Sequence, residues 1–109
     1  RIERSEIVVY RLRWPNRLVE LIKGLHPEIK RKIRGSLKDI LAEPFIGKPL
    51  KDELSGLMSL RVSRFRVVYR IVKPREIQVI AIGPRDRIYE ETYRIIRREE
   101  RTSAPKQDR

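Results

Sequence analysis

Three arginines within six positions are the residues of this chain whose types and spacing best suit chemistry. In "SLRVSRFRVVYRI", residues 59–71, Arg61, Arg64 and Arg66 lie among apolar side chains, and no acid lies nearby to neutralise them. A guanidinium group is a rigid cation whose N–H fork matches the oxygens of a phosphate. The stretch therefore predicts a site for an anionic ligand.

A second basic cluster occurs in "GPRDRIY", residues 83–89, which contributes Arg85, Arg87 and Tyr89. It follows a predicted strand, and the ends of strands are a natural place for functional side chains. The alternative is a surface loop in which the two arginines pair with the neighbouring acids Asp86, Glu90 and Glu91. The two clusters together favour phosphate binding.

The overall charge points to the same class of ligand. The chain has 27 Lys and Arg against 15 Asp and Glu, a formal net charge of +12, which favours anionic partners such as nucleic acid. The longest apolar runs are only a few residues, so residence in a membrane is disfavoured. The chain has no cysteine, which removes disulfides, thiolate metal ligands and cysteine nucleophiles, and we expect a cytoplasmic protein.

The first half of the chain predicts a strand followed by two helices. Residues 6–14 are rich in β-branched and aromatic side chains and stop at Pro15. Asn16 is the expected N-cap of a helix, and a second helix is expected from Pro27 in its first turn. Apolar residues recur at helical spacing in both: Leu18, Leu21, Ile22 and Leu25, then Ile29, Ile33, Leu37, Ile40 and Leu41. Two antiparallel helices are therefore expected.

The second half predicts a loop, three strands and a short helix. Residues 43–56 carry two prolines and two glycines, as a loop does, and strands are expected near 57–63, 65–73 and 76–82. Ile88, Thr92, Ile95 and Ile96 return to helical spacing. We expect one α+β domain over 1–97, β-α-α-β-β-β with a short C-terminal helix and a helical hairpin on one face of a mainly antiparallel sheet. Residues 98–109 predict a disordered polar tail.

The relative positions of the arginines follow if the hairpin loop is the shortest available, the two residues Ser63-Arg64. Arg61 then lies directly opposite Arg66, an arrangement in which like charges destabilise the strand pair. Alternation places Val67, Tyr69 and Ile71 toward the helices. The other face carries Arg66, Val68 and Arg70 and, on the next strand, Ile80 and Ile82. An anion docked on this face would offset the repulsion.

These residues carry a resemblance to the RelE/ParE superfamily of bacterial and archaeal toxins. The resemblance extends from Ile7 to about Tyr89. It includes "LVELIKGLHPEIKRKIRGSLKDILAEP" as the helical hairpin, "GKPLKDELSGLMSLRVSRFRVVYRI" as the central motif and "IGPRDRIY" as the terminal motif. The order Gly-x-x-Leu, Leu-x-Gly, Leu-Arg-Val and Arg-Val-Val-Tyr makes the central motif specific.

The resemblance implies a ribosome-dependent endoribonuclease that cuts messenger RNA in the decoding site and is held inactive by a cognate antitoxin. Arg61 and Arg66 match the basic residues that hold the scissile phosphate, Arg85 the arginine after the last strand, and Tyr89 the terminal aromatic. Lys51, and also Lys48, fall where the family places basic or acid/base residues. Arg64 and Arg87 are added as RNA contacts.

The chemistry agrees with this assignment except for acid/base catalysis. Attack by the 2′-hydroxyl develops negative charge on the phosphorane, which arginines stabilise. His26, the only histidine, is expected to cap a helix, Pro84 stands where some relatives have histidine, and Lys48 where others have glutamate. A base would have to be a lysine such as Lys51 with a depressed pKa. The acids form no recognisable metal-ligand set, so no metal or cofactor is expected.

Three functions remain open at this point. The first is the ribonuclease toxin, the second a ParE-like poison of DNA gyrase on the same fold, and the third a degenerate RNA-binding homologue without catalysis. The expected partners of the first are the ribosome, messenger RNA and an antitoxin segment that covers the site. Retention of Arg61, Arg66, Arg85 and Tyr89 together favours the ribonuclease.

Overall fold

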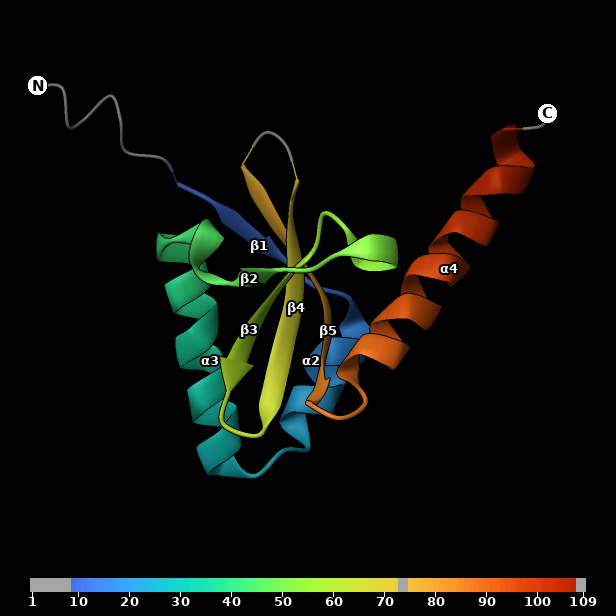
Figure 1. Ribbon diagram of the computed structural model, residues 1–109. Coiled ribbons are helices and arrows are strands. Elements are labelled where there is room, and N and C mark those ends of the chain that lie inside the picture. Colours follow the sequence, from blue (N-terminus) through green and yellow to red (C-terminus); the bar gives the residue numbers. More distant parts are fainter. Residues whose placement is uncertain (1–8, 73–74, 108–109) are drawn as a thin grey trace, which may run out of the picture.

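The computed structural model describes residues 9–72 and 75–107, with side chains as far as residue 100. In this part of the chain five strands form one sheet, and three helices pack around it (Figure 1). The strands are β1 Arg11–Arg13, β2 Lys48–Pro49, β3 Met58–Val62, β4 Phe65–Val72 and β5 Glu76–Pro84. The helices are α2 Asn16–Lys23, α3 Pro27–Ala42 and α4 Ile88–Gln107, with short 3-10 turns η1 Pro44–Ile46 and η2 Asp52–Leu54. The predicted α+β class is confirmed.

The sheet is mixed, with the strand order β1-β5-β4-β3-β2. Strand β1 runs parallel to β5, and the other neighbouring pairs are antiparallel. The segment 43–56, for which the sequence predicts a loop with a short turn of helix, contains the two 3-10 turns and also the edge strand β2, which was not predicted. This segment therefore closes one edge of the sheet next to β3.

Two apolar cores lie on opposite faces of the sheet. Leu18 and Ile22 of α2 join Ile33, Leu37 and Ile40 of α3 in the larger core. The smaller core lies against α4 and contains Leu57, Val68, Ile80, Ala81 and Ile88. The helical hairpin thus packs on one face, as predicted, and α4 crosses part of the other (Figure 1).

The helix ends show one prediction confirmed and one wrong. Pro15, with φ −74° and ψ 157°, is the N-cap of α2, and Asn16 is its first helical residue. The Pro15 carbonyl accepts the Leu18 amide at 3.0 Å, so the extended proline supplies the first turn without a side-chain cap. His26 caps α3 as expected, because its Nδ1 accepts the Glu28 amide at 3.1 Å.

Strand β1 is shorter than the sequence predicts. Of the predicted strand 6–14, only Arg11–Arg13 is a strand, and residues 6–8 lie outside the described residues. Pairing is limited to three positions, because β1 meets β5 only at Glu76, Ile77 and Gln78. Beyond Gln78, β5 has no paired strand on that side in the described part of the chain.

The β3–β4 hairpin has the predicted register. Val62 pairs with Phe65 and Arg61 with Arg66, so Ser63 and Arg64 form a two-residue loop. Ser63 has a φ of 60°, whereas Arg64 does not have a positive φ. A positive φ at the first loop position alone is the requirement of a type II′ turn, which glycine usually satisfies. The serine is therefore held in a costly conformation to keep this register.

A bulge in β5 changes which side chains share a face. Val68 pairs with Ala81 but Tyr69 with Val79, so β5 has one extra residue at this point. Ile80 faces the α4 core, as predicted, but Ile82 packs in the larger core with the helical hairpin. The prediction for Ile82 was wrong because simple alternation does not hold across a bulge.

The last helix is much longer than the short helix that the sequence predicts. Helix α4 runs from Ile88 to Gln107 and so includes most of the polar tail 98–109. Ile88 and Thr92 are fully buried, which confirms the apolar stripe of its first turns. Beyond that stripe, residues 97–100 are Arg-Arg-Glu-Glu, good helix formers that extend the helix without a core. None of the helices described is both long and apolar enough to span a membrane.

Candidate functional site

The candidate site lies on the sheet face opposite the helical hairpin. Paired residues of neighbouring strands share a face. Arg61 and Arg66 therefore lie side by side in one row, and the row before it contains Lys48, Ser59 and Val68 across β2, β3 and β4. Four of these five side chains are polar. The row of two arginines therefore lies beside a row that is partly polar, and β3 contributes a residue to each.

An open groove of about 600 Å³ lies at the hairpin end of this face. Its lining joins the two predicted basic clusters, because Arg61 and Arg64 come from the hairpin and Arg85 from the segment after β5. The Arg85 amide donates to the Arg64 carbonyl at 3.1 Å, which ties the two segments together. The remaining lining residues are Ser63, Pro84 and Asp86.

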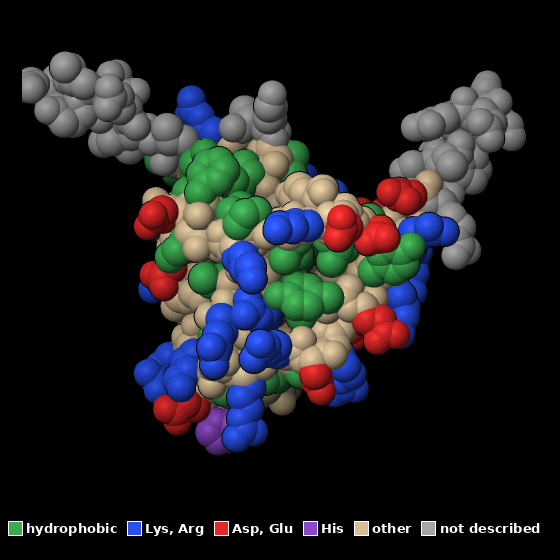
Figure 2. Space-filling view, in the orientation of Figure 1, with side chains coloured by type: hydrophobic (Ala, Val, Ile, Leu, Met, Phe, Trp, Pro, Cys, Tyr) green, Lys and Arg blue, Asp and Glu red, His purple; other side chains and the backbone are tan. Residues whose placement is uncertain are grey.

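The arginines of the two predicted clusters are not neutralised by acids, whether they line the groove, as Arg61, Arg64 and Arg85 do, or not. Within the described residues, none of Arg61, Arg64, Arg66, Arg85 and Arg87 forms an ion pair. The alternative in which the terminal arginines pair with their neighbours is not seen. Figure 2 shows a band of Lys and Arg side chains over β3 and the hairpin, with acids at its margins. The side chains of this band are exposed to solvent and produce a concentrated positive potential.

Arg66 is held by a hydroxyl that the sequence analysis missed. Its guanidinium donates to Ser59 Oγ at 3.2 Å, and Ser59 Oγ lies 3.2 Å from the hydroxyl of Tyr89. Ser59 is 1% exposed, and Tyr89 is the second residue of α4. The only signal in the sequence was the position of Ser59, two residues before Arg61 and hence on the same face.

The donor capacity of Arg66 is mostly unused. A guanidinium has five N–H donors, and a single hydrogen bond to Ser59 is formed within the described chain. Its Nε is buried and has no partner there. Arg70, further along β4 on the same face, differs, because it bonds Gln78 at 2.9 Å and pairs with Glu99 at 3.6 Å. The position of Arg66 is thus fixed by Ser59, while most of its N–H donors have no partner in the described chain.

The remaining predicted residues lie around this centre. Lys48 pairs with Ser59 and is exposed, and Lys51 is exposed just before η2. Arg87 is exposed and begins the last helix, because the Glu91 amide donates to its carbonyl at 3.1 Å. No hydrogen bond or ion pair among the described residues joins the side chains of these three to the arginines.

A buried tyrosine fixes the loop that leads to Lys48. The Tyr69 hydroxyl donates to the Pro44 carbonyl at 2.7 Å and accepts the Gly47 amide at 3.0 Å. Burial raises the pKa of this hydroxyl, and the Gly47 hydrogen bond opposes the shift. A side chain at Gly47 would meet the hydroxyl at 2.6 Å, so only glycine fits. The start of β2 is therefore rigidly positioned.

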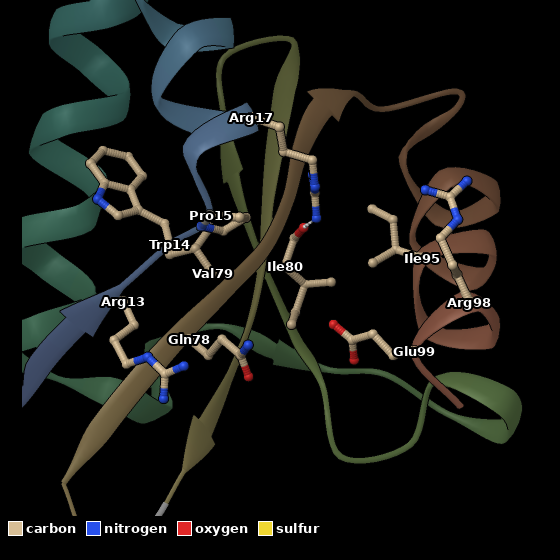
Figure 3. A pocket seen from close by; sticks show the side chains of 10 residues that line it. All are labelled: Arg13, Trp14, Pro15, Arg17, Gln78, Val79, Ile80, Ile95, Arg98 and Glu99. Atoms are coloured by element: carbon tan, nitrogen blue, oxygen red, sulfur yellow. Dashed lines mark hydrogen bonds between the residues drawn. The ribbon is translucent and has the colours of Figure 1, made fainter. Parts of the chain in front are cut away.

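A second cavity, of about 310 Å³, lies along the unpaired edge of β5 between α2 and α4 (Figure 3). Here the Arg17 guanidinium reaches across to the Ile80 carbonyl and donates to it at 2.8 Å. Arg13, at the other end, pairs with Glu76 at 3.1 Å. Ile95 and Arg98 of α4 form the opposite wall in Figure 3. In this cavity Arg17 satisfies a backbone carbonyl of β5, and Arg13 links β1 to β5 through Glu76.

The described residues include no group of three His, Asp or Glu side chains that could hold a metal ion. The acidic side chains near the groove are also few, since Asp86 is the one acid in its lining. The described part of the site therefore offers basic side chains, the carboxylate of Asp86, and the hydroxyls of two serines, Ser59 and Ser63, and of Tyr89.

The chain matches a family model described as the ParE toxin of the type II toxin-antitoxin system parDE, over residues 16–89. The chain belongs to the RelE/ParE superfamily of type II toxin-antitoxin toxins. The matched residues contain the helical hairpin, the sheet from β2 to β5 and Tyr89. No curated protein matches the chain.

Solved structures of the superfamily share the fold. A chain of the toxin-antitoxin complex RelBE2 from Mycobacterium tuberculosis is 28% identical, with a TM-score of 0.63 over 72% of this chain and 100% of that one. The free E. coli toxin RelE, in a double arginine-to-alanine mutant, is 22% identical, with a TM-score of 0.66 over 84% and 98%. A chain of the archaeal RelE-RelB complex from Pyrococcus horikoshii OT3 is also 22% identical, with a TM-score of 0.60 over 73% and 99%.

Proposed function

We propose that this toxin is a ribosome-dependent endoribonuclease. It acts in the cytoplasm and cuts messenger RNA in the A site of the ribosome. The observation that carries the proposal is the facing pair Arg61 and Arg66, which the hairpin holds in register despite the repulsion between like charges. With Arg85 across the groove, guanidinium groups from separate segments gather over one hollow without an acidic partner. A phosphodiester of RNA is the ligand that this arrangement suits.

The proposed reaction is an internal transfer of the phosphoryl group. The ribose 2′-oxygen attacks the phosphorus and loses its proton, the bond from phosphorus to the 5′-oxygen breaks, and the leaving oxygen takes up a proton. The products are a 2′,3′-cyclic phosphate and a free 5′-hydroxyl. Arg61, Arg66 and Arg85 stabilise the charge that develops on the non-bridging oxygens. No metal ion is required by this scheme.

The other predicted residues fill the remaining roles. Tyr89 lies at the end of the serine bridge and donates a hydrogen bond to the RNA. Lys51, exposed beside the sheet, is the candidate for proton transfer. Lys48, Arg64 and Arg87 contact the phosphates on either side, where each cation adds binding energy that falls with salt.

We also infer an antitoxin partner for this chain. Four of the similar structures are of a toxin in complex with an antitoxin or an antitoxin peptide. An acidic antitoxin segment would neutralise the band of Lys and Arg side chains over β3 and so compete directly with RNA. Such a segment is expected to bind more weakly as the salt concentration rises.

A second candidate is supported by the family model, which carries the ParE description. In that case the toxin would poison DNA gyrase through protein contacts, and the facing arginines would not be required for chemistry. A third candidate is a degenerate homologue that binds RNA without cutting it, because no histidine or glutamate lies in the groove lining.

One experiment separates the three candidates. The purified toxin is added to a reconstituted translation system with a defined message, and in parallel to a gyrase supercoiling reaction. The ribonuclease cuts the message only when ribosomes are present and leaves supercoiling unchanged. Blocked supercoiling with an intact message would establish the gyrase poison, and loss of both effects would establish the degenerate homologue.

A further inference from the structure

The direction of the hydrogen bonds around Ser59 can be deduced from the chemistry of its neighbours. Arg66 can only donate, so Ser59 Oγ is the acceptor in the 3.2 Å bond between them. The hydroxyl hydrogen of Ser59 then needs an acceptor of its own. Ser59 is 1% exposed, so bulk water does not supply one.

Tyr89 is the acceptor that remains. In the described part of the chain, the hydroxyl of Tyr89, 3.2 Å away, is the one other hydrogen-bond partner of Ser59 Oγ. If Tyr89 donated instead, the serine hydrogen would be buried without a partner, which is the costlier arrangement. The order of donation is therefore Arg66 to Ser59 to Tyr89.

This order leaves the hydrogen of Tyr89 free. Its oxygen accepts from Ser59, and its side chain is half-buried, so the O–H can point out of the bridge toward solvent. The cation at the other end of the bridge polarises both hydroxyls in the same sense, which strengthens the outward donor.

We propose that Ser59 is a positioning residue, which fixes the rotation of the Tyr89 hydroxyl so that its hydrogen points at the bound RNA. The inference rests on the proposed ribonuclease function and deepens it. Ser59 also holds Arg66, so one buried hydroxyl aligns a phosphate-binding cation and a hydrogen-bond donor from two segments 30 residues apart in the chain. Ser59 itself does not touch the RNA.

The test is a double-mutant cycle with Tyr89→Phe, read as single-turnover cleavage of ribosome-bound message. Ser59→Ala is expected to lower the maximal rate about 10- to 100-fold, less than the roughly 100- to 1000-fold lost when a donor is removed outright, because the Tyr89 hydroxyl remains but is no longer aimed. The toxin concentration at half-maximal rate should change less than the maximal rate, because Ser59 holds Arg66 but does not touch the RNA. Tyr89→Phe should cost much less in the Ser59→Ala background than in the wild type, because both changes remove the same directed donor.

Two further variants keep the test decisive. Ser59→Thr retains the hydroxyl and should have the wild-type rate. Ser59→Cys keeps the size of the side chain but is a weak donor, so its rate should fall as in Ser59→Ala. The cysteine variant therefore serves as the test if Ser59→Ala does not fold. The matched control is Ser36→Ala. Ser36 is also buried, bonds the Ile33 carbonyl within α3, and lies on the opposite face of the sheet.

The outcomes are distinct. Wild-type cleavage by Ser59→Ala, or an equal effect of Tyr89→Phe in both backgrounds, would overturn the role of Ser59 and leave the ribonuclease function standing. If the wild-type toxin itself fails to cut the message, the proposed function falls, and this inference falls with it. A rate loss by Ser36→Ala equal to that of Ser59→Ala would also overturn it, since the effect would then be general.

Discussion

Two arginine-rich regions of this toxin differ in what their guanidinium groups bind. Along the edge of β5, Arg17 donates to a backbone carbonyl and Arg13 pairs with Glu76. In the groove at the hairpin, Arg61 and Arg85 have no acidic partner in the described structure. The first arrangement contributes to folding, and the second costs folding energy. The difference teaches that arginines left unpaired, and not arginine content alone, mark the candidate site.

The largest expected effect is on catalysis by Arg85, which lines the groove, and by Arg66, which lies outside that lining and is held by Ser59. Arg85→Ala and Arg66→Ala should each lower the rate of message cleavage about 100- to 1000-fold, because each removes a donor aimed at the developing phosphorane charge. Single-turnover cleavage on the ribosome measures this. The Arg85 side chain is exposed and forms no hydrogen bond or ion pair with the described residues, so Arg85→Ala should unfold at the wild-type temperature. Full activity in Arg85→Ala would remove this residue from the site.

The opposite profile is expected at the edge of β5. Arg17→Ala should lower the free energy of unfolding by about 1 to 2 kcal/mol, because the Ile80 carbonyl loses a charged donor. Urea unfolding measures the change. Cleavage per folded molecule should remain at the wild-type level. A large loss of activity in stable Arg17→Ala protein would contradict the division between the two regions.

Salt dependence distinguishes the regions by their contact with RNA. For a single strand, each phosphate contact adds about 0.7 to the slope of log affinity against log salt, so Arg64→Ala should reduce the slope by about that amount. Arg13→Ala, whose guanidinium is already paired with Glu76, is the charge-matched control and should leave the slope unchanged. Fluorescence titration of a labelled RNA from 50 to 300 mM salt, as an approximate range, measures both. Equal reductions would show that only net charge matters.

The smallest expected effect is a gain in stability. Arg61→Thr removes the like charge opposite Arg66 and places a good strand former in β3, which should raise the free energy of unfolding by about 0.2 to 1 kcal/mol. The Arg61 contact with the Ser63 carbonyl, at 3.5 Å, is too long to offset this. Chemical denaturation measures the gain, and cleavage should fall. A loss of stability would mean that the arginine pair carries no repulsion.

The hairpin could be predicted because local chemistry determined it. Alternation over residues 59–71 fixed the faces, and only the two-residue loop keeps Val62 opposite Phe65. The unusual loop residue Ser63 made the register uncertain from turn statistics alone. The pairing of apolar residues across β3 and β4 outweighs that local cost.

Other parts of the site could not be predicted, because they depend on distant contacts. Ile80, Ala81 and Ile82 are all apolar, so their sequence contains no alternation that would reveal a bulge. The role of Ser59 requires Tyr89 to lie above it, and this follows from the path of α4 and not from any nearby residue. Arg17 gave no signal either, since an arginine in a first helical turn resembles ordinary surface charge.

The length of α4 shows a further limit of periodicity. The apolar stripe at Ile88 and Thr92 predicted a short helix, and the prediction ended where the stripe ended. Helix formation continues to Gln107 in a segment of charged side chains. Pairs such as Arg94 and Glu90, 3.0 Å apart one turn away, support such a helix without burial.

The extra residue in β5 shifts the alternation of side chains by one residue number between the two ends of the strand. Before it, odd-numbered positions face the helical hairpin, and after it Ile82 does so. Shortening the strand by Ile80 would restore simple alternation and, because Val79 already pairs with Tyr69 and Ala81 with Val68, would leave the residues after it on the same faces. The extra residue instead gives the α4 core a second adjacent apolar side chain, because Ile80 and Ala81 both lie there, and it supplies the carbonyl that accepts the Arg17 guanidinium.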